Sequence, residues 1–255
     1  MSKELRVASW NLWTWEGKDP EAIAEVIREN DVEIVGVQEG ATYFEDDGEK
    51  WNIVEEVAEE LGWEYEFYPA LDFRPDKPVI EGDGVISKHQ IKESSHRKLN
   101  PDDVEYDGSF EKIPRVAVKT IIEAGETDLT FLSTHLQYAF KFQTTDISRT
   151  QVSNLFEFVE ESEGPIVLTG DFNSKLDSEE IKMLEDRMER IGSDKPTWTT
   201  QPFEHEGFEV DELKYRLDNI FVTEDIDCIG TELVESELSD HLMVIADVEI
   251  PENKR

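Results

Sequence analysis

The sequence is poor in features that would each point to a particular class of protein. Its 255 residues contain one cysteine, Cys228, which excludes an intramolecular disulfide and a metal cluster held by several thiolates. No apolar run approaches the ~20 residues that a membrane-spanning helix needs. The opening segment MSKELRVASW lacks the apolar stretch of a signal peptide. We therefore expect a cytoplasmic protein without a membrane span, and a monomer.

Basic residues are scarce as well. The chain has 25 Lys and Arg against 61 Asp and Glu, a formal net charge of -36. This balance argues against a long nucleic-acid duplex as substrate at low salt, because contacts between basic side chains and phosphates dominate such binding.

The acidic residues are spread along the chain rather than gathered in a tail. Together with an aromatic content of 10%, this spread indicates a folded protein with an acidic surface. At molar salt the Debye length is ~3 Å, so the self-repulsion of such a surface is screened. We therefore favour a halophilic host over the alternative of an ordinary acidic protein.

What the chain does have is a mixture of amphipathic helices and short strands, without a linker or a repeat. Apolar spacing predicts helices at 19–30, 48–62, 148–161 and 178–192. Strands are predicted at 4–13, 32–39, 63–70, 82–91, 114–122, 128–136, 164–173, 215–223 and 241–250. Strand-rich blocks interrupt the alternation, which favours layered sheets covered by helices over a doubly wound sheet.

Polar residues of catalytic type stand where the predicted strands begin or end. They are Asn11, Glu39, His135, Asp171, Asn173, Asp218, Asp240 and His241. Buried strands seldom carry charged groups without partners, because removing a charge from water is costly. We therefore expect these strand ends to meet in one cleft, where the side chains satisfy one another or a metal ion.

The side-chain types fit the hydrolysis of a phosphate ester. Glu39 and Asp240 offer carboxylate oxygens and Asn11 offers an amide oxygen, and such ligands favour Mg²⁺ or Mn²⁺ over zinc. His135 and Asn173 can donate hydrogen bonds to anionic oxygens.

Two arrangements could activate a water molecule. Asp218 could hold the ring of His241 and stabilise its protonated form, as a carboxylate does for a catalytic imidazole. Asp171 could instead orient or deprotonate the water itself. The residues alone leave both open.

Seven segments of the chain resemble, in order, motifs of the endonuclease/exonuclease/phosphatase superfamily. They are SWNLW, VQE, GDGVISK, STHL, GDFN, RLDNIFV and SDHL, within residues 9–242. The resemblance implies one domain over residues 1–255 with an α/β fold. That fold is a four-layer α/β/β/α sandwich of two mainly antiparallel sheets, with helices outside and the site at one end.

The resemblance also implies roles for single residues. Glu39 is then the principal metal ligand, with Asn11 beside it and Asp240 assisting. Asp171 and Asn173 surround the attacking water and the phosphoryl oxygen. His135 contacts the phosphate, and Asp218 pairs with His241. Some relatives give the residue at His135 a glutamate partner, for which Glu111 is the candidate here. Asn219 stands where relatives often carry an aromatic residue or arginine.

Three further residues are weighed as substrate contacts. Arg115 and Arg149 are candidates for phosphate binding, against the alternative of ordinary surface charges. Trp198 is a candidate for stacking against the substrate, against the alternative of packing.

We therefore expect an enzyme, a phosphoesterase that depends on Mg²⁺ or Mn²⁺ and uses an in-line attack of water. A nucleic-acid phosphodiesterase acting on DNA or RNA ranks first. A phosphatase or a lipid head-group phosphodiesterase comes second, and a binding module without turnover is the alternative of another class.

Overall fold

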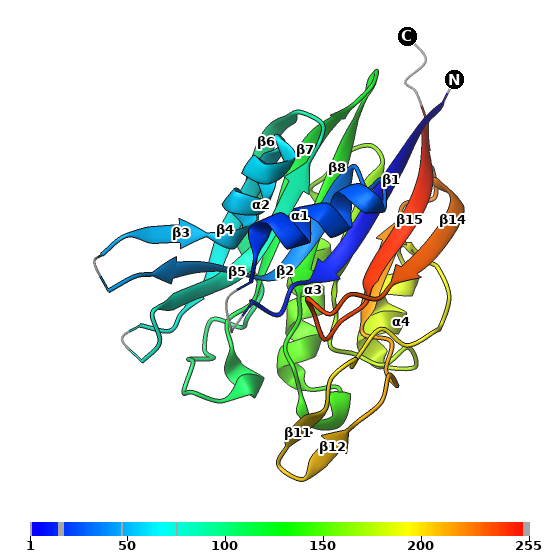
Figure 1. Cartoon of the computed structure of the whole chain (residues 1–255). Helices are drawn as coiled ribbons and strands as arrows, with labels where there is room; N and C mark the ends of the chain where they lie inside the picture. Colours follow the sequence, from blue (N-terminus) through cyan, green and yellow to red (C-terminus); the bar gives the residue numbers. More distant parts are fainter. Residues whose placement is uncertain (1, 15–17, 47, 75, 252–255) are drawn as a thin grey trace.

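The structure is a computed structural model that describes residues 2–14, 18–46, 48–74 and 76–251. Two β-sheets lie face to face, and helices cover their outer faces (Figure 1). This is the predicted four-layer α/β/β/α sandwich. Among the described residues, no helix is long and apolar enough to cross a membrane.

The first sheet is built from the two ends of the chain. Its strands run in the order β14-β15-β1-β2-β5-β4, with β3 added to β2. Their bounds are β1 (Ser2–Asn11), β2 (Ile34–Phe44), β3 (Lys50–Asn52), β4 (Glu64–Asp72), β5 (Val79–Ser87), β14 (Asp227–Val234) and β15 (Met243–Pro251). All neighbours are antiparallel except β1 and β2, which α1 (Pro20–Glu29) connects.

The second sheet comes from the middle of the chain, in the order β10-β13-β9-β8-β7-β6. Its strands are β6 (Ile91–Lys98), β7 (Val116–Ala124), β8 (Thr127–His135), β9 (Ile166–Asp171), β10 (Glu189–Ile191) and β13 (Asp218–Val222). Here too one central pair is parallel, β8 with β9, and α3 (Asp146–Glu160) connects it. A small hairpin, β11 (Phe203–His205) with β12 (Phe208–Val210), stands apart from both sheets.

Three apolar layers hold the sandwich together. The inner faces of the two sheets share one core, which includes Val7, Val85, Phe131 and Ile220. A second core lies between the first sheet and the helices α1 and α2 (Ile53–Leu61), and a third between the second sheet and the helices α3 and α4 (Glu179–Glu185). Burying these faces drives the association of the layers.

Local sequence signals set the helix ends, with two corrections. The helix predicted at 178–192 ends at Glu185, and Glu189–Ile191 pairs with β13 as β10. Asp19 caps α1 as predicted, since its side chain accepts from the backbone N–H of Glu21. The second helix begins at Ile53 rather than at residue 48. The reason is Asn52, whose side chain accepts from the N–H groups of Val54 and Glu55 and so caps the helix five residues late. The residues before it pair with β2 as β3.

Candidate active site

The predicted polar residues do converge at one end of the sandwich. Asn11, His135 and Asp171 are the last residues of β1, β8 and β9. Glu39 was predicted at a strand end but lies within β2, directly after Gln38, the last residue of β2 that pairs with β1. Carboxyl ends of parallel strands are the usual place for ligands in mixed α/β proteins. Asp218 and His241 reach the same end because β13 and β15 run antiparallel to β9 and β1 and begin there.

Close backbone approach makes the juxtaposition possible. In the pairing of β8 with β9, His135 lies beside Asp171 and Thr134 beside Gly170. A Cβ at Gly170 would come within 2.4 Å of the Thr134 carbonyl oxygen. A larger residue there would force the strands apart. The glycine of GDFN therefore keeps the histidine and the aspartate side by side.

Glu39 is displayed by a β-bulge. The register between β2 and β5 shifts between Val37 and Gly40, and Glu39 has a left-handed backbone with φ of 53°. Bulges redirect side chains, and non-glycine residues with positive φ gather at functional sites. Asn173 shows the same conformation, with φ of 46°.

The spacing of Asp171 and Asn173 has a structural reason as well as a chemical one. The backbone N–H of Asn173 donates to Asp171 Oδ1 at 2.9 Å, which closes an Asx-turn. The turn aims the Asn173 carboxamide at His135, whose Nε2 lies 2.8 Å from Asn173 Nδ2. The same Nδ2 donates to the Leu136 carbonyl at 3.1 Å.

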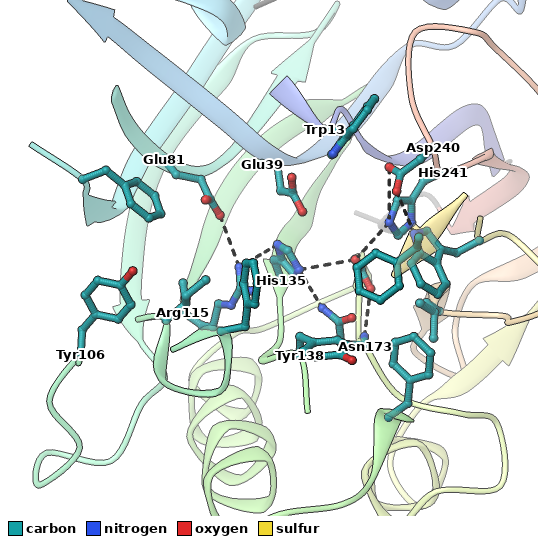
Figure 2. Close-up of a pocket in the computed structure, with 18 of the residues that line it drawn as sticks. Trp13, Glu39, Glu81, Tyr106, Arg115, His135, Tyr138, Asn173, Asp240 and His241 are labelled. Carbon is teal, nitrogen blue, oxygen red and sulfur yellow. Dashed lines mark hydrogen bonds and ion pairs between the residues drawn. The ribbon is translucent and has the colours of Figure 1, made fainter. Parts of the chain in front are cut away.

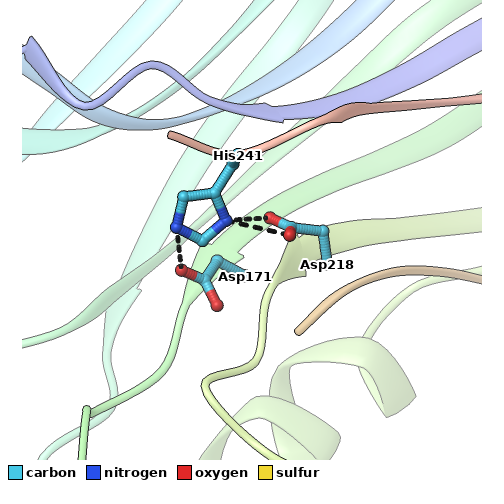
Figure 3. A group of neighbouring side chains, drawn as sticks. All are labelled: Asp171, Asp218 and His241. Atoms are coloured by element: carbon cyan, nitrogen blue, oxygen red, sulfur yellow. Dashed lines mark hydrogen bonds and ion pairs between the residues drawn. The ribbon is translucent and has the colours of Figure 1, made fainter. Parts of the chain in front are cut away.

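Asp218 and His241 form the expected pair (Figure 3). His241 Nδ1 lies 2.9 Å from Asp218 Oδ2, and its Nε2 lies 3.7 Å from Asp171 Oδ2. Burial alone would lower the pKa of His241, but the carboxylates of Asp218, Asp240 and Asp171 outweigh it and raise the pKa well above its usual value. His241 therefore carries a proton at neutral pH.

His135 has the opposite state. Burial lowers its pKa well below the usual value, and the charges of Arg115 and His241 act in the same direction. Its Nδ1 lies 2.9 Å from Arg115 Nη1. Because a guanidinium only donates, Nδ1 is the acceptor of this hydrogen bond. The other ring nitrogen, Nε2, lies 3.4 Å from Asp171 Oδ2.

The expected glutamate partner of His135 is thus wrong. Glu111 lies in a 3₁₀ turn (Phe110–Lys112), and the position beside Nδ1 belongs to Arg115. Arg115 is only 5% exposed and also lies 3.4 Å from Glu81 Oε1. The interpretation of Arg115 as an ordinary surface charge is therefore also wrong.

Glu39, Asp240 and Glu81 form a concentration of negative charge. Burial, with the charges of Glu81 and Asp240, raises the pKa of Glu39 to about 8. Asp240 Oδ2 accepts from the Trp198 indole N–H at 2.8 Å, while its Oδ1 is buried with no hydrogen-bond partner. A cation placed here would compensate the repulsion and satisfy the orphaned oxygen.

Two buried carboxylates on β5, Glu81 and Asp83, were not among the predicted site residues. The criterion that selected the other residues, a charge inside an apolar strand, applies equally to "VIEGDGVIS". Burial raises the pKa of both carboxyl groups, that of Asp83 well above its usual value.

The two remaining candidates differ. Trp198 is 5% exposed, packs in an apolar cluster with Phe142 and Leu217, and donates its indole N–H to Asp240, although it also lines the cavity. Arg149 lies on the outer side of α3 in ion pairs with Asp146 and Glu179, as a surface charge does.

Six of the eight predicted residues line one cavity of about 590 Å³ (Figure 2). They are Glu39, His135, Asp171, Asn173, Asp240 and His241. The cavity has the size of a small-molecule site.

The two facing sheets with helices outside are the fold expected of a phosphoesterase sandwich. The chain belongs to the Endonuclease/Exonuclease/phosphatase family, whose model matches residues 8–241. Members of this family are hydrolases that act on phosphate esters. No curated protein sequence matches the chain.

Solved structures share the fold at low sequence identity. The human Nocturnin catalytic domain with bound sulfate superposes with a TM-score of 0.73 and 17% identity, covering 98% of this chain and 94% of its own. ANGEL2, a 2′,3′-cyclic phosphatase, gives 0.72 and 16%, covering 98% and 96%. A mannosyl-6-phosphatase from Bacteroides thetaiotaomicron gives 0.68 and 20%, covering 96% and 99%. At these identities the likeness shows the fold alone.

Proposed function

We propose that the protein is a divalent-metal-dependent phosphoesterase that hydrolyses a phosphate ester by in-line attack of water. One observation carries the proposal. Asp171 Oδ2 lies 3.1 Å from Asn11 Nδ2, 3.4 Å from His135 Nε2 and 3.7 Å from His241 Nε2. A single carboxylate oxygen is thus the meeting point of three groups suited to handle one phosphate.

The residues present fit a hard cation. Glu39 and Asp240 would hold it, and Asn11 would join them when its carboxamide turns to present Oδ1. An all-oxygen set of this kind suits Mg²⁺ or Mn²⁺. Bound there, the ion would polarise a phosphoryl oxygen and offset developing negative charge.

Asp171 is the favoured general base of the two left open by the sequence. Burial is the main cause that raises its pKa to about 6, so it is ionised at neutral pH yet basic enough to take a proton from water. His241 is less suited, because its carboxylate neighbours keep it protonated. Its Nε2–H would instead donate to a phosphoryl oxygen.

Neutral donors complete the electrostatic environment. The N–H of a neutral His135 and the Nδ2 of Asn173 would donate to oxygens whose charge grows in the transition state, since His135 Nε2 lies 3.4 Å from Asp171 Oδ2 and next to Asn173. Because the low pKa of His135 leaves it neutral, we assign it hydrogen-bond donation rather than protonation of the leaving group.

For the substrate we keep a nucleic-acid phosphodiester ahead of a phosphomonoester or a lipid head group. Aromatic side chains in the cavity, among them Tyr106 and Phe110, support a substrate that carries bases. The Bacteroides mannosyl-6-phosphatase keeps the phosphomonoester alternative open.

A hydrolysis assay tests the proposal. Purified protein is incubated with bis-p-nitrophenyl phosphate and with single-stranded DNA, duplex DNA, RNA, phosphorylated inositols and sphingomyelin, each with Mg²⁺ or Mn²⁺ at low and at molar KCl. We expect turnover that EDTA abolishes. If the protein binds one of these substrates but shows metal-dependent turnover of none of them, it is a binding module instead.

A further inference from the structure

The cavity extends beyond the phosphate-handling residues to an aromatic rim formed by Phe73, Tyr106 and Phe110. Tyr106 is 38% exposed and Phe110 50% exposed. In the described part of the chain only four large apolar side chains are this exposed, and two of them line this one cavity. Exposed aromatic surface grouped around a cavity marks a binding site.

The rim differs from the other aromatic wall of the cavity. On that wall Phe142 and Trp198 are 4% and 5% exposed and pack among themselves beside the β11–β12 hairpin, so their faces are already covered. The rings of the aromatic rim stand on the segments after β4 and before β7 and keep accessible faces. Phe73 and Tyr106 touch edge to face, with centroids 6.3 Å apart.

Phe110 joins the two walls. Its ring centroid lies 6.4 Å from that of Tyr138, which also lines the cavity, and 5.2 Å from that of His205 at the end of β11. A long chain passing through the cavity at this point would have to displace the ring. The cavity therefore suits a small ligand or the end of a strand better than the middle of a duplex.

Arg115 and Glu81 lie between the rim and the phosphate-handling residues. Arg115 Nη1 lies 2.9 Å from His135 Nδ1 and 3.4 Å from Glu81 Oε1. In Figure 2 Tyr106 lies on the far side of Arg115 from His135. All four side chains line the same cavity, so one ligand in it can contact the rim and the phosphate-handling residues together.

The polar groups of the rim favour a base over an alkyl chain. Asp76, Lys77 and the backbone of Gly108 line the same part of the cavity. An aliphatic chain would remove them from water without replacing their hydrogen bonds, which is costly. A nucleobase offers a flat face for the aromatic rings and a polar edge for these groups.

Resting on the proposed phosphoesterase function, we propose that the aromatic rim binds the nucleobase of a single nucleotide, or of the terminal nucleotide of a single strand. Its phosphate lies against His135, Asp171 and His241. Lys77 and Arg115 are the only lysine and arginine among the described residues that line the cavity, which suits a ligand with few phosphates better than a long polyanion.

Two ligands that differ only in the base test the proposal: adenosine 5′-monophosphate and ribose 5-phosphate. Dissociation constants are measured by titration calorimetry with Mg²⁺, and phosphate release is assayed in the same samples to separate turnover from binding. We expect the nucleotide to bind about ten-fold or more tightly, the order expected for stacking of one base.

Substitutions locate the effect. The double variant Tyr106→Ala with Phe110→Ala should reduce the preference to less than about two-fold, whereas Tyr106→Phe keeps the ring and the preference. Ile229→Ala removes a similarly exposed apolar side chain outside this cavity and should leave the preference for the nucleotide unchanged.

Three outcomes would overturn the proposal: equal affinity of the wild-type protein for both ligands, an equal loss for both ligands in the double variant, or octyl phosphate binding as tightly as the nucleotide. Hydrolysis of bis-p-nitrophenyl phosphate is scored separately. Metal-dependent turnover without a base preference would leave the phosphoesterase function standing and remove only the base site.

Discussion

The carboxamide of Asn11 joins Glu39 to Asp171. Its Nδ2 donates to Glu39 Oε1 and to Asp171 Oδ2, each at 3.1 Å, while its Oδ1 accepts from the backbone N–H of Trp13 at 3.0 Å. The two carboxylates belong to different sheets, so one amide connects the proposed metal ligand with the proposed base.

This bridge predicts the effect of Asn11→Asp. The substitution would place a third carboxylate between two others, which raises the pKa of Asp171 because like charges disfavour ionisation. We expect the acid limb of the profile of kcat/KM against pH to move upward by about one unit. Asn11→Ala removes the donor without adding charge and should move it less. An acid limb that stays in place in Asn11→Asp would contradict the bridge.

The base assignment predicts a large loss in Asp171→Asn. Removing a positioned general base costs roughly 10²- to 10⁴-fold in rate, and the loss should appear in kcat. In the wild-type protein, activity should fall as the pH drops through about 6, because the carboxylate is then protonated. Circular dichroism checks the fold, and Asp211→Asn, at an exposed position, is the matched control. Near-full activity in Asp171→Asn would remove it as base.

The pair of Asp218 with His241 predicts a spectroscopic change. Asp218→Asn removes the charge that contributes most to raising the pKa of His241, so the imidazole should lose its proton at lower pH. Nuclear magnetic resonance of the ring protons measures this shift directly. We also expect at least a ~100-fold lower rate near neutral pH, since a neutral ring stabilises an anionic transition state less. An unchanged titration would show that other groups hold the proton on His241.

Metal binding should release a proton. Because burial and neighbouring charges raise the pKa of Glu39 to about 8, its carboxyl group is mostly protonated at pH 7 and must ionise to ligate a cation. Titration calorimetry with Mg²⁺ in buffers of different ionisation enthalpy should show nearly one proton released at pH 7 and almost none above pH 9. The affinity for Mg²⁺ should rise as the pH increases from 7 to 9. Glu39→Gln should abolish the release, and a wild-type value near zero at pH 7 would refute this role.

The acidic surface predicts stabilisation by salt. With a net charge of -36, the folded chain repels itself at low ionic strength, and molar KCl screens that repulsion. We expect the melting temperature to rise by several degrees between about 50 mM and about 2 M KCl. The double variant Glu59→Lys with Glu60→Lys should show a smaller rise in melting temperature with KCl. A melting temperature that does not rise would count against a halophilic origin.

The sequence was most informative where one local rule decides the outcome. Strand ends in apolar runs located Asp171 and His241, and the N-cap Asp19 located a helix start. The register shift at Glu39 could not be predicted from the sequence, because a bulge depends on how β2 pairs with β5. The start of the second helix was predicted five residues too early, because the N-cap Asn52 lies inside the apolar pattern from which the helix was predicted.

Side-chain partners across the fold were the hardest to predict. Nothing local indicates that Arg115 lies against His135, because Arg115 directly precedes β7, His135 ends the neighbouring strand β8, and the pairing of these two strands sets the contact. The aromatic rim escaped notice for the same reason, since Phe73 and Tyr106 come from loops that only the folded sandwich brings together.

The pairing of β1 with β15 has a consequence for the order of assembly. β1 is synthesised before every other strand, whereas its neighbour β15 and the adjoining His241 follow all the other strands of both sheets. The proton-bearing imidazole is therefore the last of the converging side chains to join the site.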